Sequence, residues 1–499
     1  MNVFSLFQSR FPHDENAIFI ETANGRLVNY DELDKTSARL ANLLLSVGIK
    51  KGDRVAVQVE KSPEVLFLYL AVLRVGAIYL PLNTAYTDNE LDYFLGDATP
   101  GLFVARPQDE ARARELGQRN QVASVLTLGA ESDGTLMSAA ERHSTDVATA
   151  ECSDDDIGVI LYTSGTTGRP KGAMISHGNL AANAIALHEF WQWQSGDVLL
   201  HALPIFHIHG LFVACHCVLL NGSKMIFLEK FDVPTVLKYL PRSTVMMGVP
   251  TFYVRLLASA EFAREHCSNM RLFISGSAPL LEQTFNDFRE RTGMTILERY
   301  GMTETGMNTS NPVDGARLAG TVGPPLPGVT VRIVDDQQND VATGEIGNLL
   351  VKGDNVFRGY WNMPEKTAEE FTVDGFFKTG DMAMQDENGY VSIVGRDKDL
   401  VISGGLNVYP KEVEFEIDQI DGVVESAVIG VPHADFGEAV TAIVVCAPGV
   451  SLDEQSVIGH IKSRLANYKV PKTVRFVDAL PRNTMGKVQK NVLRDQYSN

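Results

Sequence analysis

The sequence predicts an α/β protein built from more than one domain, and three observations support this prediction. The chain has 499 residues, which is too long for one simple core. From residue 1 to about 150, strand-like and helical segments alternate, an order typical of parallel α/β layers. Residues 395–399 form a charged run, and the roughly one hundred residues after it have the pattern of a small α/β unit.

The first strands and helices follow from the spacing of the apolar side chains. Residues 30–47 place leucines along one side of a helix, and residues 64–75 have the apolar pattern of a buried helix. Residues 54–59 and 77–82 have the composition of strands. The charged residues 109–114 favour a helix that faces solvent, and we assign them no chemistry.

The composition is that of an ordinary globular protein without a nucleic-acid surface. Hydrophobic residues make up 44% of the chain and charged residues 21%. The net charge of −18 argues against nucleic acid or an anionic membrane as a partner, so local basic groups must attract any anionic substrate. No apolar run has the length of a membrane span, and residues 1–11 lack the pattern of a secretory signal. We therefore expect a cytoplasmic protein.

The five cysteines are few and scattered, which suits a reducing compartment. Cys215 and Cys217 lie near several histidines in the sequence, as the ligands of a metal site would. Their spacing lacks the gap of two to four residues typical of zinc ligands, and they lie in the apolar run 210–220. We favour buried thiols over a zinc site.

A loop rich in glycine and threonine follows the apolar run 157–161, which we predict to be a buried strand ending at Tyr162. Glycines let the backbone approach a ligand closely, while hydroxyls and a lysine supply donors and a charge, as a polyphosphate requires. The lysine follows proline and precedes glycine, so this is not a Walker A loop. A flexible linker is the alternative, but a linker would not carry Pro-Lys-Gly so close to a strand. The predicted phosphate-binding residues are Thr163, Ser164, Gly165, Thr166, Thr167, Gly168 and Lys171.

Later segments alternate in the same way. Residues 245–250 have the pattern of a strand, and residues 251–257 that of a helix that Thr251 caps. Residues 271–280 combine a strand with a polar loop. The segments after residue 400 are predicted to form one helix and two strands, at 410–420, 425–431 and 440–446.

The ordered motifs of the chain resemble those of the adenylate-forming superfamily, which contains acyl-CoA synthetases, luciferases and nonribosomal adenylation domains. The segments that carry the resemblance are YTSGTTGRPKG, HALPIFHIHG, RLFISGSAPL, ERYGMTET, DGFFKTGD, GRDKD and PRNTMGK, and they span essentially the whole chain. The resemblance implies a large N-terminal domain of layered mixed sheets and helices at residues 1–397. It further implies a small, mobile α+β C-terminal domain at residues 399–499, with Lys398 as the hinge.

The resemblance also implies an ATP site with Mg²⁺. Tyr300 offers a flat face for adenine, Thr303 a hydroxyl near the α-phosphate, and Glu304 a hard oxygen ligand for Mg²⁺. Asp381 is placed to accept both ribose hydroxyls, and Arg396 to touch the ribose. The remaining nucleotide-binding candidates are Ser277, Ala278, Pro279, Glu298, Arg299, Gly301 and Met302.

The same resemblance assigns the carboxylate and coenzyme A. His207 lies beside the carboxylate being activated, and Lys487 reaches the reacting group. Ser403, Gly404 and Gly405 resemble the loop that lines a pantetheine tunnel, where glycines let a thiol arm pass close to the backbone. A lysine-acylating regulator of Lys487 is a further expected partner, since acylation would remove its charge. The expected catalytic set is Lys487, Glu304, Thr303 and His207.

Arg255 allows two interpretations, because its sequence neighbours are apolar. It either extends to solvent or pairs with an internal acid. Alternatively it points into the acyl pocket, where its fork would bind a carboxylate. An arginine without a partner would be costly in an apolar pocket, so the second interpretation favours a dicarboxylate substrate.

Within the superfamily, segments such as MGVPTFYVRLL and GGLNVYPKEVE resemble the malonate–CoA ligases. That resemblance implies that malonate and ATP give an acyl-adenylate and diphosphate, after which coenzyme A releases AMP. Two alternatives stay open: a ligase for another acid, such as methylmalonate or a short fatty or aryl acid, and a non-catalytic nucleotide-binding protein. The second would be expected to lack Lys487 or Glu304. No pocket residue is carried over to Ile208 or Gly306, so tolerance of 2-substituted malonates is open.

Overall fold

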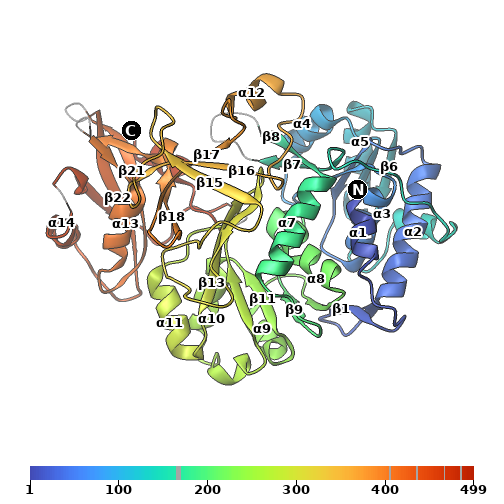
Figure 1. Ribbon diagram of the computed structural model, residues 1–499, viewed down its shortest axis with the longest axis horizontal. Helices are drawn as coiled ribbons and strands as arrows, with labels where there is room; N and C mark the ends of the chain where they lie inside the picture. Colours follow the sequence, from blue (N-terminus) through green and yellow to red (C-terminus); the bar gives the residue numbers. More distant parts are fainter. Residues whose placement is uncertain (164–169, 404–405, 434–436, 466, 484–485, 499) are drawn as a thin grey trace.

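The computed structural model describes residues 1–498 apart from 164–169, 404–405, 434–436, 466 and 484–485. The described residues form four sheets, and the colours of Figure 1 run along the chain from the blue N-terminal part to the red C-terminal part. Among the described helices, none is long and apolar enough to cross a bilayer.

The first sheet has six strands, and adjacent strands in it are parallel except for one terminal hairpin. In spatial order the strands are β6 (Ser124–Thr127), β5 (Leu102–Ala105), β3 (Arg54–Gln58), β4 (Ile78–Pro81), β7 (Ile157–Thr163) and β8 (Lys171–Ser176). The β7–β8 hairpin pairs Thr163 with Lys171, so the predicted phosphate loop joins the two strands. The predicted strands at 54–59, 77–82 and 157–161 are confirmed.

The second sheet has eight strands, parallel in its centre and antiparallel at both edges. In spatial order they are β14 (Gly306–Ser310), β13 (Ile296–Met302), β12 (Leu272–Ser275), β11 (Val245–Gly248), β9 (Val198–His201), β10 (Lys224–Phe227), β1 (Ile18–Thr22) and β2 (Leu27–Asn29). Because the centre is parallel, the carboxyl ends of β9, β11 and β12 meet at one edge, where ligands bind in open α/β sheets.

A shared apolar core joins these two sheets. Helix α3 (Pro63–Arg74) is buried along its whole length, as its continuous apolar pattern predicts, and its side chains join one core cluster with residues from both sheets. Helices α1 (Val3–Gln8), α7 (His177–Phe190) and α8 (His216–Asn221) contribute to the same cluster. The remaining helices of this region are α2 (Tyr30–Ser46), α4 (Asp88–Ala98), α5 (Glu110–Arg119), α6 (Thr135–Ala140), α9 (Val233–Tyr239), α10 (Pro250–Ala258) and α11 (Glu282–Thr292).

Helix α10 corrects one local prediction. Thr251 does not cap it, because Pro250 is already the first helical residue and Val249 takes the cap position without a side-chain hydrogen bond. Proline suits that position, since its fixed backbone angle and missing N–H cost nothing in a first turn. Thr251 is therefore inside the helix.

Two smaller sheets complete the chain, and in Figure 1 the four-stranded one lies between the N-terminal body and the C-terminal unit at the left. It is antiparallel, with β15 (Val329–Val334), β16 (Gly347–Gly353), β17 (Phe377–Gln385) and β18 (Val391–Arg396), and α12 (Pro364–Glu369) lies between β16 and β17 in the sequence. The last sheet contains β19 (Val401–Ser403), β20 (Leu406–Val408), β21 (Val423–His433), β22 (Gly437–Cys446) and β23 (Thr473–Phe476). Helices α13 (Pro410–Asp418), α14 (Glu454–Lys462) and α15 (Lys490–Tyr497) accompany it.

The two smaller sheets are joined by the short segment Asp397–Asp399, which forms a single helical turn. Lys398 stands at its centre and is exposed. The domain limits 1–397 and 399–499 with a hinge at Lys398 agree with this change from one sheet to the next, and they stay a prediction about motion.

Candidate active site

Three residues that the sequence assigned to the nucleotide lie in contact. The Tyr300 hydroxyl donates to Asp381 Oδ2 at 2.5 Å, and Arg396 Nε lies 3.0 Å from Asp381 Oδ1. Asp381 and Arg396 face each other across β17 and β18, and Tyr300 comes from β13 of the large sheet. Asp381 is only 4% exposed. The site thus joins two sheets around one buried carboxylate, which can only accept hydrogen bonds.

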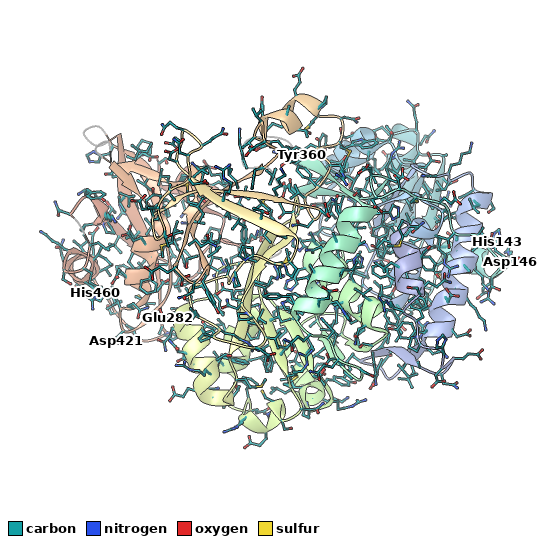
Figure 2. All side chains as sticks on the ribbon, in the orientation of Figure 1. His143, Asp146, Glu282, Tyr360, Asp421 and His460 are labelled. Atoms are coloured by element: carbon teal, nitrogen blue, oxygen red, sulfur yellow. The ribbon has the colours of Figure 1, made fainter. Side chains whose placement is uncertain are left out.

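Glu304 is buried close to the strand pair β13–β14, and its carboxylate is held by a residue that the sequence analysis missed. The Tyr360 hydroxyl donates to Glu304 Oε1 at 3.1 Å, and burial raises the pKa of Glu304. Tyr360 is labelled in Figure 2 just below the α12 ribbon. An aromatic residue in the stretch RGYWNMPEKT carries no chemical signature of its own, so no pattern in the sequence points to this role.

The same tyrosine also holds Lys171. The Lys171 ammonium lies 4.2 Å from the centre of the Tyr360 ring and 3.5 Å from Glu370 Oε1. On the opposite strand, the Thr163 hydroxyl lies 3.5 Å from the Lys171 carbonyl. Lys171, Tyr360 and Glu304 therefore form one chain of contacts beside the predicted phosphate loop. Residues Ser164, Gly165, Thr166, Thr167 and Gly168 lie outside the described residues.

The site fits Mg²⁺ that arrives with a nucleotide. Among the described residues, no group of three His, Cys, Asp or Glu side chains is placed to hold a metal on its own. Mg²⁺ commonly takes one or two protein carboxylates together with substrate phosphates, and Glu304 offers one such carboxylate. A cation beside Glu304 would favour its charged form against the raised pKa. Thr303, half-buried, precedes it.

His207 and His209 lie in a buried pocket at the carboxyl edge of the large sheet. The His209 N–H donates to His207 Nδ1 at 3.3 Å, so neutral His207 carries its proton on Nε2. Burial, Lys487 and Arg299 together lower the pKa of His207 to about 3. His207 is therefore a neutral hydrogen-bond donor at pH 7. Ser277 completes this group, with its hydroxyl 3.2 Å from His209 Nδ1.

Ser277 also has an uncommon backbone, with φ of +71°. For a residue other than glycine this conformation costs on the order of 1 kcal/mol, and such strain clusters at functional sites. The predicted Gly/Ser loop after β12 thus brings Ser277 to the histidines. Its neighbours Ala278 and Pro279 are half-buried and exposed, respectively.

Arg299 is the charged centre of this pocket. It is 3% exposed, and its Nε and Nη2 atoms have no hydrogen-bond partner within the described part of the chain. A Cβ atom at Gly276 would lie 2.5 Å from Arg299 Cζ, so glycine leaves room for the guanidinium. Burial lowers the pKa of Arg299 to about 9. A buried cation without an anion costs several kcal/mol, so the pocket is suited to a negatively charged ligand.

The neighbours of Arg299 on β13 face the other way. Side chains alternate along a strand, so Arg299 points to the opposite face from Glu298 and Tyr300. Glu298 is buried, accepts a hydrogen bond from the Leu280 N–H at 3.0 Å, and has its pKa raised to about 7 by burial. The alternation of side chains along the strand was therefore the signal that places Arg299 on a different face from Tyr300. Gly301 and Met302, half-buried, continue the strand.

The surroundings of Arg255 agree with the interpretation in which its side chain extends to solvent. Arg255 is exposed on α10, so an apolar enclosure around it is not present. No ion pair joins it to an acid in the ranges that the structure covers. A Cβ at Gly486 would lie 3.7 Å from the Thr251 hydroxyl oxygen, and residues four apart share a helix face. Arg255 is therefore on the side of α10 that meets the C-terminal loop.

Lys487 reaches the site from that C-terminal loop. Its N–H donates to Asn483 Oδ1 at 2.9 Å, and Arg482 Nη1 donates to the Gly486 carbonyl at 2.5 Å. The residue as a whole is exposed, but its ammonium group lies among protein atoms. Desolvation first and then repulsion from Arg396 lower its pKa, while Asp381 and Glu304 raise it. The charge of this one lysine is thus influenced by the Asp381–Arg396 pair, by Glu304 and by Arg299.

The coenzyme A candidates are only partly described. Ser403 is buried on β19 and pairs with Leu406. Gly404 and Gly405 lie outside the described residues. Lys398 is exposed as a residue, but its ammonium group is partly desolvated, and this desolvation lowers its pKa to about 8. Cys215 and Cys217 are buried, and burial raises the pKa of the Cys215 thiol to about 12.

Comparisons with known proteins match this geometry. The AMP-binding enzyme model matches residues 6–361, and the model for the C-terminal domain of such enzymes matches residues 412–487. The chain is similar to the crystal structure of ATP-bound MatB from Rhodopseudomonas palustris, with 54% identity, a TM-score of 0.98 and coverage of 100% of this chain and 99% of that chain. Against apo MatB from the same organism the TM-score is 0.88.

Curated relatives include enzymes that are named for different acids. The malonate–CoA ligase of Arabidopsis thaliana is 34% identical, with 100% of this chain and 89% of the relative covered. The feruloyl-CoA synthase of an Amycolatopsis species is 36% identical, with 95% and 94% covered. The family models, these relatives and the close structural match lead to one conclusion. The chain belongs to the AMP-binding enzyme family and is an AMP-forming acid–thiol ligase that uses ATP and coenzyme A.

Proposed function

We propose that this ligase acts on malonate: malonate and ATP give malonyl-AMP and diphosphate, and coenzyme A then gives malonyl-CoA and AMP. The resemblance to MatB and to a malonate–CoA ligase supports this choice, although a feruloyl-CoA synthase is similar at the same level as the latter. Similarity alone therefore does not distinguish malonate from an aryl acid, and the charges in the pocket do.

The observation that carries the proposal is the buried Arg299. Malonate keeps one carboxylate charged while the other reacts, and that charge needs a cation. Arg299 offers Nε and Nη2 without a protein partner, beside His207 and Ser277. A monocarboxylic or aryl acid would leave this cation unpaired, at a cost of several kcal/mol. We thus assign Arg299 to the retained carboxylate, with Arg255 as a second cation at the mouth.

In the adenylation step, an oxygen of the reacting carboxylate attacks the α-phosphorus of ATP. The new C–O–P linkage forms as the bond to diphosphate breaks. The Lys487 ammonium neutralises charge at the reacting oxygens, and the His207 Nε2–H orients the carboxylate. Glu304 holds Mg²⁺, which supplies further neutralisation of phosphate charge when bound. Thr303 donates its hydroxyl near the α-phosphate.

In the second step, the thiol of coenzyme A attacks the acyl carbon and AMP leaves. Lys487 blocks the phosphate side in the present arrangement, so it must withdraw. Rotation about Lys398 exchanges Lys487 for the face that carries Ser403, Gly404 and Gly405. Acylation of Lys487 removes its charge and stops the first step. Complete acetylation that leaves diphosphate release unchanged would contradict this regulation.

A substrate panel tests the assignment. Diphosphate release is measured with malonate, methylmalonate, succinate, acetate and ferulate, each with and without coenzyme A. We expect the highest kcat/KM for malonate, with thioester formed only when coenzyme A is present. A higher kcat/KM for acetate or ferulate than for malonate would overturn the assignment.

A further inference from the structure

We infer that Lys61 and His201 are positioning residues that fix both ends of the segment carrying His207. Lys61 follows β3 of the six-stranded sheet, whereas His201 ends β9 of the eight-stranded sheet. The segment between His201 and Gly210 carries His207 into the pocket. The inference rests on the proposed function in one respect, that His207 orients the reacting carboxylate.

The Lys61 ammonium fixes the start of this segment. Its three N–H donors meet three acceptors: His201 Nδ1 at 2.8 Å, the His201 carbonyl at 3.1 Å and the Leu203 carbonyl at 2.9 Å. The Nζ atom also lies 4.2 Å from the centre of the Phe227 ring, on the strand next to β9. Burial of the ammonium lowers the pKa of Lys61 to about 7, while Cys215 and Glu229 favour the charged form. Hydrogen bonds to the three acceptors favour the ammonium as well.

His201 transmits this contact to the end of the segment. An ammonium can only donate, so His201 Nδ1 accepts and Nε2 carries the proton. Nε2 lies 2.9 Å from the Gly210 carbonyl, to which it therefore donates. His201 is 1% exposed, so its ring has little freedom to turn. One imidazole thus links Lys61 to Gly210, across the base of the segment.

The segment closes on itself but lacks support on one side. A Cβ at Gly210 would lie 1.9 Å from the Pro204 carbonyl oxygen, so the end of the segment lies against Pro204 and only glycine fits. Pro204, Ile205 and Phe206 line a cavity of about 120 Å³ together with Lys61, Glu60 and Glu229. Packing leaves this cavity unfilled on one side of the segment, although Ile205 and Ile208 are buried in the main apolar core. The hydrogen bonds from Lys61 and His201 therefore set its position, and with it that of His207.

The test uses Lys61→Met, which keeps the length of the side chain and removes the donors. We expect the KM for malonate to rise at least tenfold while the KM for ATP changes less than twofold. His201→Asn keeps an acceptor near Lys61 and removes the donor to Gly210, and should shift the malonate KM in the same direction. Lys224→Met is the matched control, because Lys224 lies on the adjacent strand β10 and contacts Glu21 at 2.5 Å instead. It should change neither KM.

A double-mutant cycle separates positioning from general stability. If Lys61 acts through His207, Lys61→Met should raise the malonate KM less than twofold in a His207→Ala background. A full tenfold rise in that background overturns the inference, as does an equal rise in the KM for ATP. If His207→Ala alone leaves malonate turnover unchanged, the proposed role of His207 fails, and with it the route by which Lys61 was argued to act.

Discussion

At the residue scale, substrate choice depends on which buried charges lack a partner. Arg299 is enclosed and Arg255 is exposed, so the two arginines differ in what their removal costs. Loss of one partner of a buried charge pair costs 2–5 kcal/mol or more, whereas a rim charge contributes little and mainly steers association.

We expect Arg299→Leu to lower kcat/KM for malonate by a hundredfold or more, and Arg255→Leu to lower it by about tenfold. Steady-state kinetics with malonate and acetate provide the measurement, with ATP affinity as the control for folding. Acetate turnover by Arg299→Leu should be spared. If Arg255→Leu lowers kcat/KM for malonate more than Arg299→Leu does, the retained carboxylate binds at Arg255 and not at Arg299.

Tyr360 allows a second test on a single side chain. Tyr360→Phe keeps the ring beneath Lys171 but removes the hydroxyl that donates to Glu304. A hydrogen bond to a charged group contributes about 1.5–3 kcal/mol, so ATP–diphosphate exchange should fall at least tenfold. Tyr360→Leu removes both contacts and should cost more. Equal rates for Tyr360→Phe and the unchanged enzyme at limiting Mg²⁺ would show that the hydroxyl does not orient Glu304.

Sequence reasoning named Tyr300 and Asp381, which the structure brings into contact, but it could not choose between the two interpretations of Arg255 or find the surroundings of Arg299, for a physical reason. The apolar neighbours Val254 and Leu256 are each about 100° around the helix from Arg255, so they do not report its surroundings. Arg299 stands in the same motif as Tyr300, but strand alternation sends it to the opposite face. Contacts between distant segments, such as Tyr360 with Glu304, leave no trace in local spacing.

At the scale of elements, patterns set by burial were the most predictable. The continuous apolar segment at 64–75 could only be a buried helix, and α3 is fully buried. The start of α10 was misplaced because a threonine is a common cap, while Pro250 already begins the helix. The positions of loops relative to distant sheets, as for Lys61 and His201, depend on the assembled fold.

The C-terminal loop that carries Lys487 is the element on which the first step depends. We expect Lys487→Ala to abolish formation of malonyl-AMP, because the ammonium serves that transition state. Conversion of supplied malonyl-AMP and coenzyme A to the thioester should proceed at a rate close to that of the unchanged enzyme. Separate assays of the two half-reactions give the measurement, and comparable losses in both would mean that the lysine is structural.

Strand β13 contributes a pH dependence through Glu298. Burial raises the pKa of its carboxyl from an ordinary 4.5 to about 7. The stability that this raised pKa supplies is therefore complete below pH 4.5 and is lost as the pH rises through 7. Glu298→Gln removes this titration. From pH 5 to pH 8 the free energy of unfolding of the unchanged chain should therefore fall relative to that of the variant, by on the order of 3 kcal/mol. Urea unfolding at both pH values checks this, and an equal difference at both would contradict it.

At the scale of the whole molecule, the proposed mechanism requires two arrangements of the same parts, one for each half of the reaction. The present arrangement brings Lys487 to the nucleotide side and resembles ATP-bound MatB more than apo MatB. A covalent lock between the N-terminal body and the C-terminal loop tests whether this arrangement serves only the first step.

Thr251 and Gly486 offer that lock, since a Cβ at Gly486 would lie within 3.8 Å of both outer atoms of the Thr251 side chain. We expect the oxidised double cysteine variant to make malonyl-AMP and to stop there, with thioester formation restored by a thiol reductant. Gly486 has φ of +76°, so each single cysteine variant is needed as a control for strain. A lock that leaves thioester formation unchanged would exclude the proposed rotation.

The pairing of Asp381 with Arg396 has a consequence for what travels during that rotation. Arg396 is the last residue of β18, and the proposed pivot begins at the next residue. A point on an axis stays in place while distant points sweep through wide arcs. A ribose bound by Asp381 and Arg396 would therefore lie close to the rotation axis. The adenylate could then stay in place while Lys487 and the coenzyme A thiol approach the acyl carbon one after the other.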